Sequence, residues 1–386
     1  MGRATRGCGC AVAVLIVLAA AAGFIGYRFV YPWWKTKPLP PSGGELQVHV
    51  LDVGPSDGDS ILIISPAGKT VLIDAGDKSK TKIKIVLDAL KRYKVEQLDY
   101  FIGTNPHSDH LGGAAEVFKA VKILNVIDNG QGPSVPADLA PPPKSANSST
   151  DKKQLPVKQP ANKKLSKMAS ITKFYDDYKD ALNKSGAHYE KAQPGTKYDL
   201  GGGTLLTILG PLEPFFTKEQ MKAGGNETNA NSVVARLDYG VFSMLLPGDA
   251  EEQTEHRMLS KDLNVQARIL KLAHHGSKYA SADDFLKRVK PEVVIISCGE
   301  WNRYGHPAQA VLDRLRAANV KLYRTDLQGE ITITTRGKEN DYAVKAAKET
   351  TADLWTGRTA QKDDSSRSGF IAYGDFGPPP KTAKKP

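Results

Sequence analysis

The chain has 386 residues, of which 40% are hydrophobic and 25% are charged, a composition typical of a folded protein with one large domain. Its formal net charge of +11 would suit a nucleic-acid-binding domain. The basic excess, however, lies in residues 1–44, 131–168 and 337–386, which leaves the remainder close to neutral. A uniformly basic DNA-binding domain is therefore disfavoured. Three cysteines are too few for a disulfide framework.

Residues 1–34 are predicted to form a membrane anchor. The twenty residues 8–27 carry no charge and can cross roughly 30 Å of hydrocarbon as a helix. Aromatic residues follow them, as in an interfacial belt. The alternative is a cleaved signal peptide, because the small residues of LAAAAG offer a peptidase site. Both alternatives place the rest of the chain outside the cytoplasm, either anchored to the membrane by this helix or secreted.

Residues 35–44 form a Pro/Gly/Ser-rich linker, and the main domain is expected over 45–336. Its first half alternates apolar strand-like runs with amphipathic helical ones, which indicates an α/β fold. The expected strands are 46–53, 60–65, 69–76, 99–104 and 122–128, and the expected helices are 82–93 and 114–122.

Residues 131–168 interrupt this rhythm with Pro, Lys, Ser and Asn, so we interpret them as a disordered or loosely held insert. A helix is expected over 171–186, followed by a second β-rich stretch that ends near Thr335. The tail, 337–386, is expected to be mobile. Two halves of strands and helices suit two sheets packed face to face with helices outside.

The strongest chemical signal is TNPHSDHLGG, residues 104–113, at the end of an apolar strand. His107, Asp109 and His110 can converge on one divalent cation if the backbone turns back sharply, which the glycine pair after them would allow.

The second half adds candidates at the ends of strands. Asp249 follows FSMLLPG, and its carboxylate either bridges metals or caps the next helix. His274 and His275 end another strand in HHGS, and His306 lies in RYGHP. Glu251 and Glu252 are expected on the exposed first turn of a helix.

Several motifs together resemble the metallo-β-lactamase-fold hydrolases, and among them the soluble hydrolase domain of the ComEC/Rec2 competence proteins. They are LDVGPSDGDSILI, KTVLIDAG, TNPHSDHLGG, NANSVVARLDYGVFSMLLPGDA, LAHHGS, RYGHP and YRTDLQG. The resemblance implies an αββα four-layer sandwich, here preceded by one transmembrane helix or signal anchor. It also implies a metal centre at one edge between the sheets.

Carried over by position, the resemblance implies a set of metal ligands, with further candidates around them. The implied ligands are His107, Asp109, His110, Asp249 and His275; Asn105, His274 and Asp74 are candidates for a ligand or for orienting one; Ser277, Asn302 and Arg303 are candidates for substrate binding. Asp109 and His306 are the candidate catalytic residues.

Two departures from the family pattern concern a second metal. Asn105 stands where the first histidine of the family's HxHxDH signature is expected, and Asn229 or Asn231 stands where many members have another histidine. An amide is a poorer ligand than imidazole. One or two ions, zinc or manganese, are therefore expected, with the second site in doubt.

The resemblance implies a metal-dependent phosphodiesterase or nuclease as the first hypothesis, with nucleic acid or another phosphodiester as the substrate. A hydrolase of another ester or amide, such as a choline phosphoester or a lactam, is the second hypothesis. A degenerate, metal-poor binding module, motivated by Asn105, is the third. No protein partner can be inferred.

Overall fold

The computed structural model describes residues 44–54, 57–133, 161–221, 225–300, 302 and 304–358. The predicted anchor at 1–34 and most of the insert at 131–168 lie outside these ranges. Within the described ranges, no helix combines the length and the apolar character needed to span a bilayer.

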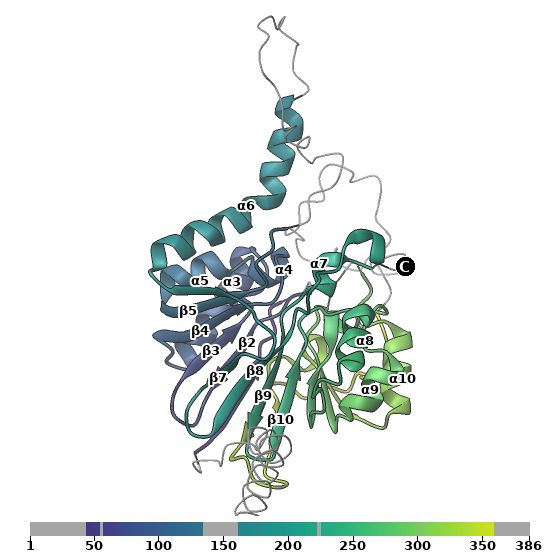
Figure 1. Cartoon of the computed structure of the whole chain (residues 1–386). Helices are drawn as coiled ribbons and strands as arrows, with labels where there is room; N and C mark the ends of the chain where they lie inside the picture. Colours follow the sequence, from purple (N-terminus) through teal and green to yellow (C-terminus); the bar gives the residue numbers. More distant parts are fainter. Residues whose placement is uncertain are drawn as a thin grey trace, which may run out of the picture. The chain divides into compact units, whose positions relative to one another are not determined.

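The described strands form two sheets that lie face to face (Figure 1). The first sheet has the order β15-β14-β1-β2-β3-β4-β5-β6 and the second has the order β13-β12-β11-β10-β9-β8-β7. The first sheet consists of β1 Leu46–Val50, β2 Ile61–Ile64, β3 Thr70–Ile73, β4 Gln97–Gly103, β5 Lys122–Asp128, β6 His188–Lys191, β14 Ile331–Thr335 and β15 Ala343–Ala346. The second consists of β7 Lys197–Asp199, β8 Thr204–Gly210, β9 Val234–Tyr239, β10 Phe242–Leu246, β11 Ile269–Lys271, β12 Val293–Ile296 and β13 Lys321–Arg324.

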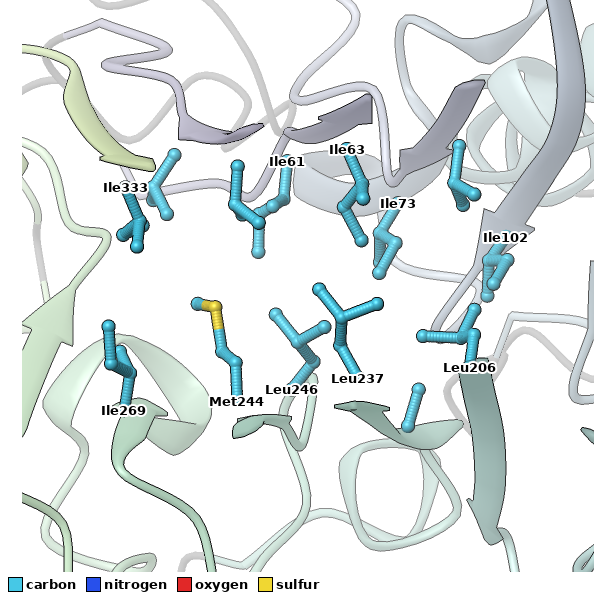
Figure 2. Close-up of a cluster of buried hydrophobic side chains, with 14 of the residues drawn as sticks. Ile61, Ile63, Ile73, Ile102, Leu206, Leu237, Met244, Leu246, Ile269 and Ile333 are labelled. Atoms are coloured by element: carbon cyan, nitrogen blue, oxygen red, sulfur yellow. The ribbon is translucent and has the colours of Figure 1, made fainter. Parts of the chain in front are cut away.

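The main core lies between the two sheets. Figure 2 shows Ile61, Ile63 and Ile73 of the first sheet facing side chains such as Leu237 and Leu246 of the second. Alternate residues of β1 and β2 point into this layer, as the two-residue period of a strand requires. Burying each Ile or Leu side chain stabilises the fold by about 1.5–3 kcal/mol, so this layer holds the two sheets together.

Helices cover the outer face of each sheet (Figure 1). The helices around the first sheet are α3 Lys80–Arg92, α4 Ser108–Leu111, α5 Ala114–Ala120 and α6 Ala161–Ser185; those around the second are α7 Glu227–Ala230, α8 Glu252–Ser260, α9 Asp283–Val289, α10 Gln309–Ala317 and α11 Thr325–Gln328, with two short 3-10 turns at Lys218–Gln220 and Ala273–Gly276. α3 illustrates the local logic: Ser79 caps its N-terminus, and Val86, Ala89 and Leu90 form its buried face. Apolar side chains beneath these helices form two outer cores. The expected αββα arrangement is confirmed.

Two expected boundaries were wrong. α6 begins at Ala161, inside the stretch 131–168 that was interpreted as disordered or loosely held. Residues 161–170 contain the helix formers Ala, Lys, Leu and Met, and a polar composition does not prevent a helix.

The domain also continues beyond Arg336 into the expected mobile tail. β15 pairs antiparallel with β14, with Ile331 opposite Ala346. The Arg324 guanidinium donates to the carbonyl oxygens of Leu354 and Thr356. A four-residue strand of sequence AVKA is too short and too weakly apolar to stand out in the sequence, although it covers an otherwise bare sheet edge.

Candidate metal centre

His110 occupies the loop and short helix that follow β4. Its Nδ1 lies 2.7 Å from Oδ2 of the fully buried Asp74, which follows β3. Asp74 also accepts hydrogen bonds from the amide and the hydroxyl of Thr104, at 2.7 and 2.6 Å. The carboxylate can only accept, so it fixes the proton on Nδ1 and turns Nε2 toward the site. Asp74 therefore orients His110.

The glycine pair after His110 allows close packing rather than an unusual turn. Gly112 and Gly113 have φ values of −59° and −89°, which any residue adopts. A Cβ on Gly112 would lie 2.2 Å from the Lys78 amide nitrogen, and one on Gly113 would lie 2.3 Å from the Ala75 carbonyl oxygen. The pair thus lets the His110 helix press against the loop that carries Asp74.

The second sheet supplies Asp249 and His275. Asp249 follows β10, and its Oδ2 lies 3.0 Å from Nε2 of His110. His275 lies in the 3-10 turn after β11, where Nδ1 donates to the Ser297 carbonyl oxygen at 2.9 Å. Its Nε2 is therefore free and faces Oδ1 of Asp249 at 3.5 Å. His274 and His275 both have left-handed backbones, with φ of 49° and 55°, a strain of roughly 1–3 kcal/mol each that is typical of functional sites.

Asp59, which the sequence did not single out, completes a group of four buried residues with the three expected ligands His110, Asp249 and His275. Ligand atoms of Asp59, His110, Asp249 and His275 lie within 4.8 Å of one another. Asp59 lies in the loop before β2, with Oδ1 3.6 Å from Nδ1 of His275 and Oδ2 paired with the buried Lys271 ammonium. Its sequence signal was SDGDS, residues 56–60, a loop-like stretch inside a motif that carried the family resemblance.

The donor atoms of this group fit a divalent cation. Asp59 Oδ1, Asp249 Oδ1 and His275 Nε2 are buried and have no hydrogen-bond partner within the described residues. Leaving such atoms unpaired costs about 1–3 kcal/mol each, which a bound cation would recover. Imidazole and carboxylate are ligands of divalent transition metals.

Charge coupling in this cluster is strong. Burial alone would lower the pKa of His110, but Asp249 and Asp74 raise it well above its ordinary value. Burial likewise opposes charge on His275, yet Asp249 and Asp59 raise its pKa to about 9. Burial would raise the pKa of Asp249, but the same two histidines hold it well below its usual range. Without a cation, protons on the imidazoles thus balance the buried carboxylates.

Asp109 lies at the edge of this cluster, with Oδ2 3.6 Å from Nε2 of His275 and its side chain 22% exposed. Burial would raise the pKa of its carboxyl, but His110 and His275 lower it below the ordinary value. The carboxylate is therefore ionised at neutral pH, which suits a ligand better than a proton acceptor.

Asn105 and Asn229, which stand where the resemblance implies histidine ligands, both lie within hydrogen-bond distance of other side chains. Asn105 donates to the Ser232 hydroxyl at 3.2 Å and accepts from the His107 amide at 3.0 Å. The Asn229 amide nitrogen lies 3.1 Å from Nε2 of His274. Burial lowers the pKa of His107, and it lowers that of His274 to about 3. Both imidazoles are thus neutral. Nε2 of His274, however, is already paired with the side-chain amide of Asn229.

Asn231, the alternative to Asn229, serves the backbone. Its side chain accepts from the Phe216 amide and donates to the Phe216 carbonyl oxygen, both at 2.9 Å. Of the two asparagines, Asn229 therefore faces the site.

His306 lies beside the cluster. Its Nδ1 donates to Oδ2 of Asp57 at 2.8 Å, and its ring contacts those of His274 and His275 at centroid distances of 5.4 and 6.3 Å. Asn302 binds the backbone of His306, accepting from its amide at 2.7 Å and donating to its carbonyl oxygen at 2.5 Å.

Ser277 and Asn302, two of the three candidates for substrate binding, support the backbone of nearby turns. The hydroxyl of Ser277 is buried and accepts from the amide of Tyr279 at 3.3 Å, which supports the local turn. Asn302 supports the backbone as described. Arg303 lies outside the described residues.

Glu251 corrects an expectation. It is fully buried instead of exposed, and both carboxylate oxygens accept from the Asn226 amide at 3.1 Å. Burial raises its pKa to about 7. Glu252 begins α8 and is partly exposed. The helix-start pattern could not show that the loop before α7 would cover Glu251.

Comparison with known proteins identifies the class that this fold and site define. The family model described as "Metallo-beta-lactamase superfamily" matches residues 53–300, and the chain belongs to that family. The superfamily is generally hydrolytic and metal-dependent.

Within it, the chain is ComEC/Rec2-like, as the motifs indicated. It is 25% identical to ComE operon protein 3 of Bacillus subtilis (strain 168) over 331 residues, 82% of this chain and 35% of that protein. It is 39% identical to Competence protein ComA of Neisseria gonorrhoeae over 106 residues, 27% of this chain and 15% of that protein. It is 34% identical to Recombination protein 2 of Haemophilus influenzae (strain ATCC 51907 / DSM 11121 / KW20 / Rd) over 105 residues, 27% of this chain and 13% of that protein. The chain thus spans about a third or less of the length of these relatives.

Proposed function

We propose that the chain is a metal-dependent phosphodiesterase that acts on nucleic acid. The observation that carries this proposal is the buried group of donor atoms on Asp59, Asp249 and His275, which have no hydrogen-bond partner within the described residues. The names of the relatives, which refer to competence and recombination, support a nucleic-acid substrate.

Zinc is the proposed cation and manganese the alternative, since histidine nitrogen and carboxylate oxygen bind both. His110, Asp249 and His275 would hold it, with Asp59 and Asp109 beside them. A cation held there supplies Lewis acidity, which acidifies water and polarises the scissile bond. We propose a single ion, because Asn105 and Asn229 replace imidazoles at the second position.

His306 is the proposed proton carrier. Because its Nδ1 donates to Asp57, its Nε2 is the atom that can take up or release a proton at a substrate oxygen. Asp57 and Asn302 fix the ring and its backbone, so the imidazole is positioned before substrate arrives. Asp109, ionised and partly exposed, would help to hold the cation instead of moving protons.

The test uses the full-length chain, stripped of metal and reloaded with zinc or manganese. We expect hydrolysis of bis(p-nitrophenyl) phosphate and single-stranded DNA, abolished by Asp249→Asn and retained by the matched control Glu252→Gln. Turnover of a β-lactam or a choline phosphoester without turnover of either phosphodiester would overturn the proposal. Failure to bind metal at all would favour a non-catalytic binding module.

We also propose that the hydrolase domain lies outside the cytoplasm, on the strength of the uncharged stretch 8–27. Protease treatment of intact cells should degrade the domain, and membrane fractionation should separate a retained anchor from a secreted form. A domain that protease reaches only after lysis would contradict this location.

A further inference from the structure

A pocket of about 400 Å³ lies between α6 and the strands β5 and β6 of the first sheet. Tyr175 and Tyr189 line it, together with the apolar side chain of Leu182. Asp128, the last residue of β5, also lines the pocket, although only 4% of it is exposed. None of the proposed metal ligands is part of the lining, so this pocket is separate from the candidate metal centre.

The Asp128 carboxylate is held in place by hydrogen bonds. Oδ1 accepts from the Tyr189 hydroxyl at 2.8 Å and from the Gly130 amide at 2.7 Å, and Oδ2 accepts from the Tyr178 hydroxyl at 2.9 Å. Burial and the nearby carboxylate raise the pKa values of both tyrosines, so their hydroxyls stay protonated and donate. Within the described ranges, no basic side chain forms an ion pair with Asp128. Because buried charges are normally paired, Asp128 is suited to receive a cation.

The ring of Tyr175 already receives an ammonium group. Nζ of Lys179, which also lines the pocket, lies 5.0 Å from the centroid of this ring, within the range of a cation–π contact. The same Nζ pairs with Asp176 at 3.2 Å, and the Lys179 side chain is 51% exposed. Lys179 is thus balanced by its own helix, and Asp128 leaves the pocket with a net negative charge. Tyr175 is fixed, because its hydroxyl donates to the Gln131 carbonyl oxygen at 2.9 Å.

We propose that this pocket binds a small primary alkylammonium ion. Its N–H groups donate to Oδ2 of Asp128, which accepts only one hydrogen bond from the described residues and has room for another. The rings of Tyr175 and Tyr189 lie beside the charged group, and the alkyl chain packs against Leu182. A neutral alcohol of similar shape lacks both the ion pair and the cation–π contact. Because no proposed metal ligand or catalytic residue takes part, the inference is independent of the phosphodiesterase function.

The first test is calorimetric titration of the full-length chain with n-butylammonium, n-butanol and butyrate at constant ionic strength. We expect saturable binding of n-butylammonium, much weaker binding of the alcohol and none of the anion. Asp128→Asn should weaken n-butylammonium binding about tenfold or more, the effect of losing a hydrogen bond to a charged group. Tyr189→Leu should weaken it about 2- to 30-fold, the range of one cation–π contact. Equal affinity for the alcohol and the ammonium ion, or no saturable binding, would overturn the inference.

A second variant keeps the test decisive if Asp128→Asn fails to fold. Lys179→Gln changes an exposed side chain, removes a like charge from the pocket and frees the face of Tyr175. It should tighten n-butylammonium binding about twofold or more, without changing the affinity for n-butanol. The matched control is Lys173→Gln, which removes the same charge from α6, where Lys173 pairs with Asp177 at 2.8 Å outside the pocket lining. Equal effects of the two lysine variants, or none in Lys179→Gln, would show that Asp128 only braces the tyrosines.

Discussion

Replacing Asp74 with asparagine tests how the protein orients His110. The carboxylate of Asp74 accepts three hydrogen bonds, two from Thr104 and one from Nδ1 of His110. An amide of the same shape keeps one acceptor but turns an NH₂ group toward its other partners. Nδ1 of His110 then loses its acceptor, or the imidazole proton moves to Nε2, the atom that faces Asp249.

Loss of such an orienting partner typically weakens metal binding 10- to 100-fold, or about 1.4–2.8 kcal/mol. We therefore expect Asp74→Asn to bind zinc 10- to 100-fold more weakly in competition with a chromophoric chelator. Stabilisation against thermal unfolding by a fixed free zinc concentration should fall by the same free energy.

The matched control is Asp99→Asn. Asp99 lies on β4, and its Oδ2 accepts from the Thr70 amide at 2.9 Å, so it makes the same kind of cross-strand contact away from the cluster. Its replacement should leave zinc affinity unchanged. Equal affinity of wild type and Asp74→Asn, or an equal loss in both variants, would refute the orienting role.

Three further predictions concern the same centre. Asp249→Asn should remove bound metal and activity while Glu252→Gln keeps both, and equal losses on elemental analysis would contradict a ligand role. Asn105→His should raise the metal-to-protein ratio, because imidazole binds borderline cations better than an amide, whereas an unchanged ratio would mean that the second site is absent. Zinc affinity should increase with pH up to about 9, because His110 and His275 hold protons in the metal-free protein that the cation must displace. Chelator competition across pH 6 to 9 measures this profile, and an affinity that levels off above about pH 7, as ordinary imidazoles would give, would contradict the raised pKa values.

The sequence indicated the strands and the strand ends that carry chemistry, because both are local patterns. Residues such as His110 and Asp249 stand out in the polar segments that follow apolar runs, and the structure brings the two side chains within 3.0 Å. Asp59 could not be found in this way, because its partner Lys271 is 212 residues away and its own surroundings look like a polar loop. Lys271 itself was a usable signal, since a lysine inside the buried strand ILK needs a buried partner. The burial of Glu251 likewise depends on a distant loop.

The pairing of β1 with β14 has consequences for how the chain is made. Leu46 lies opposite Thr335, so one of the earliest strands finds its neighbour only after nearly the whole domain has been synthesised. At about 5–20 residues per second, that delay is on the order of 15–60 s. During it, one edge of β1 offers bare amides and carbonyls to any other nascent strand. A ribosome that stalls before Ile331 therefore releases a product with an open β1 edge, and such products should aggregate even when His275 and every other proposed ligand are already present.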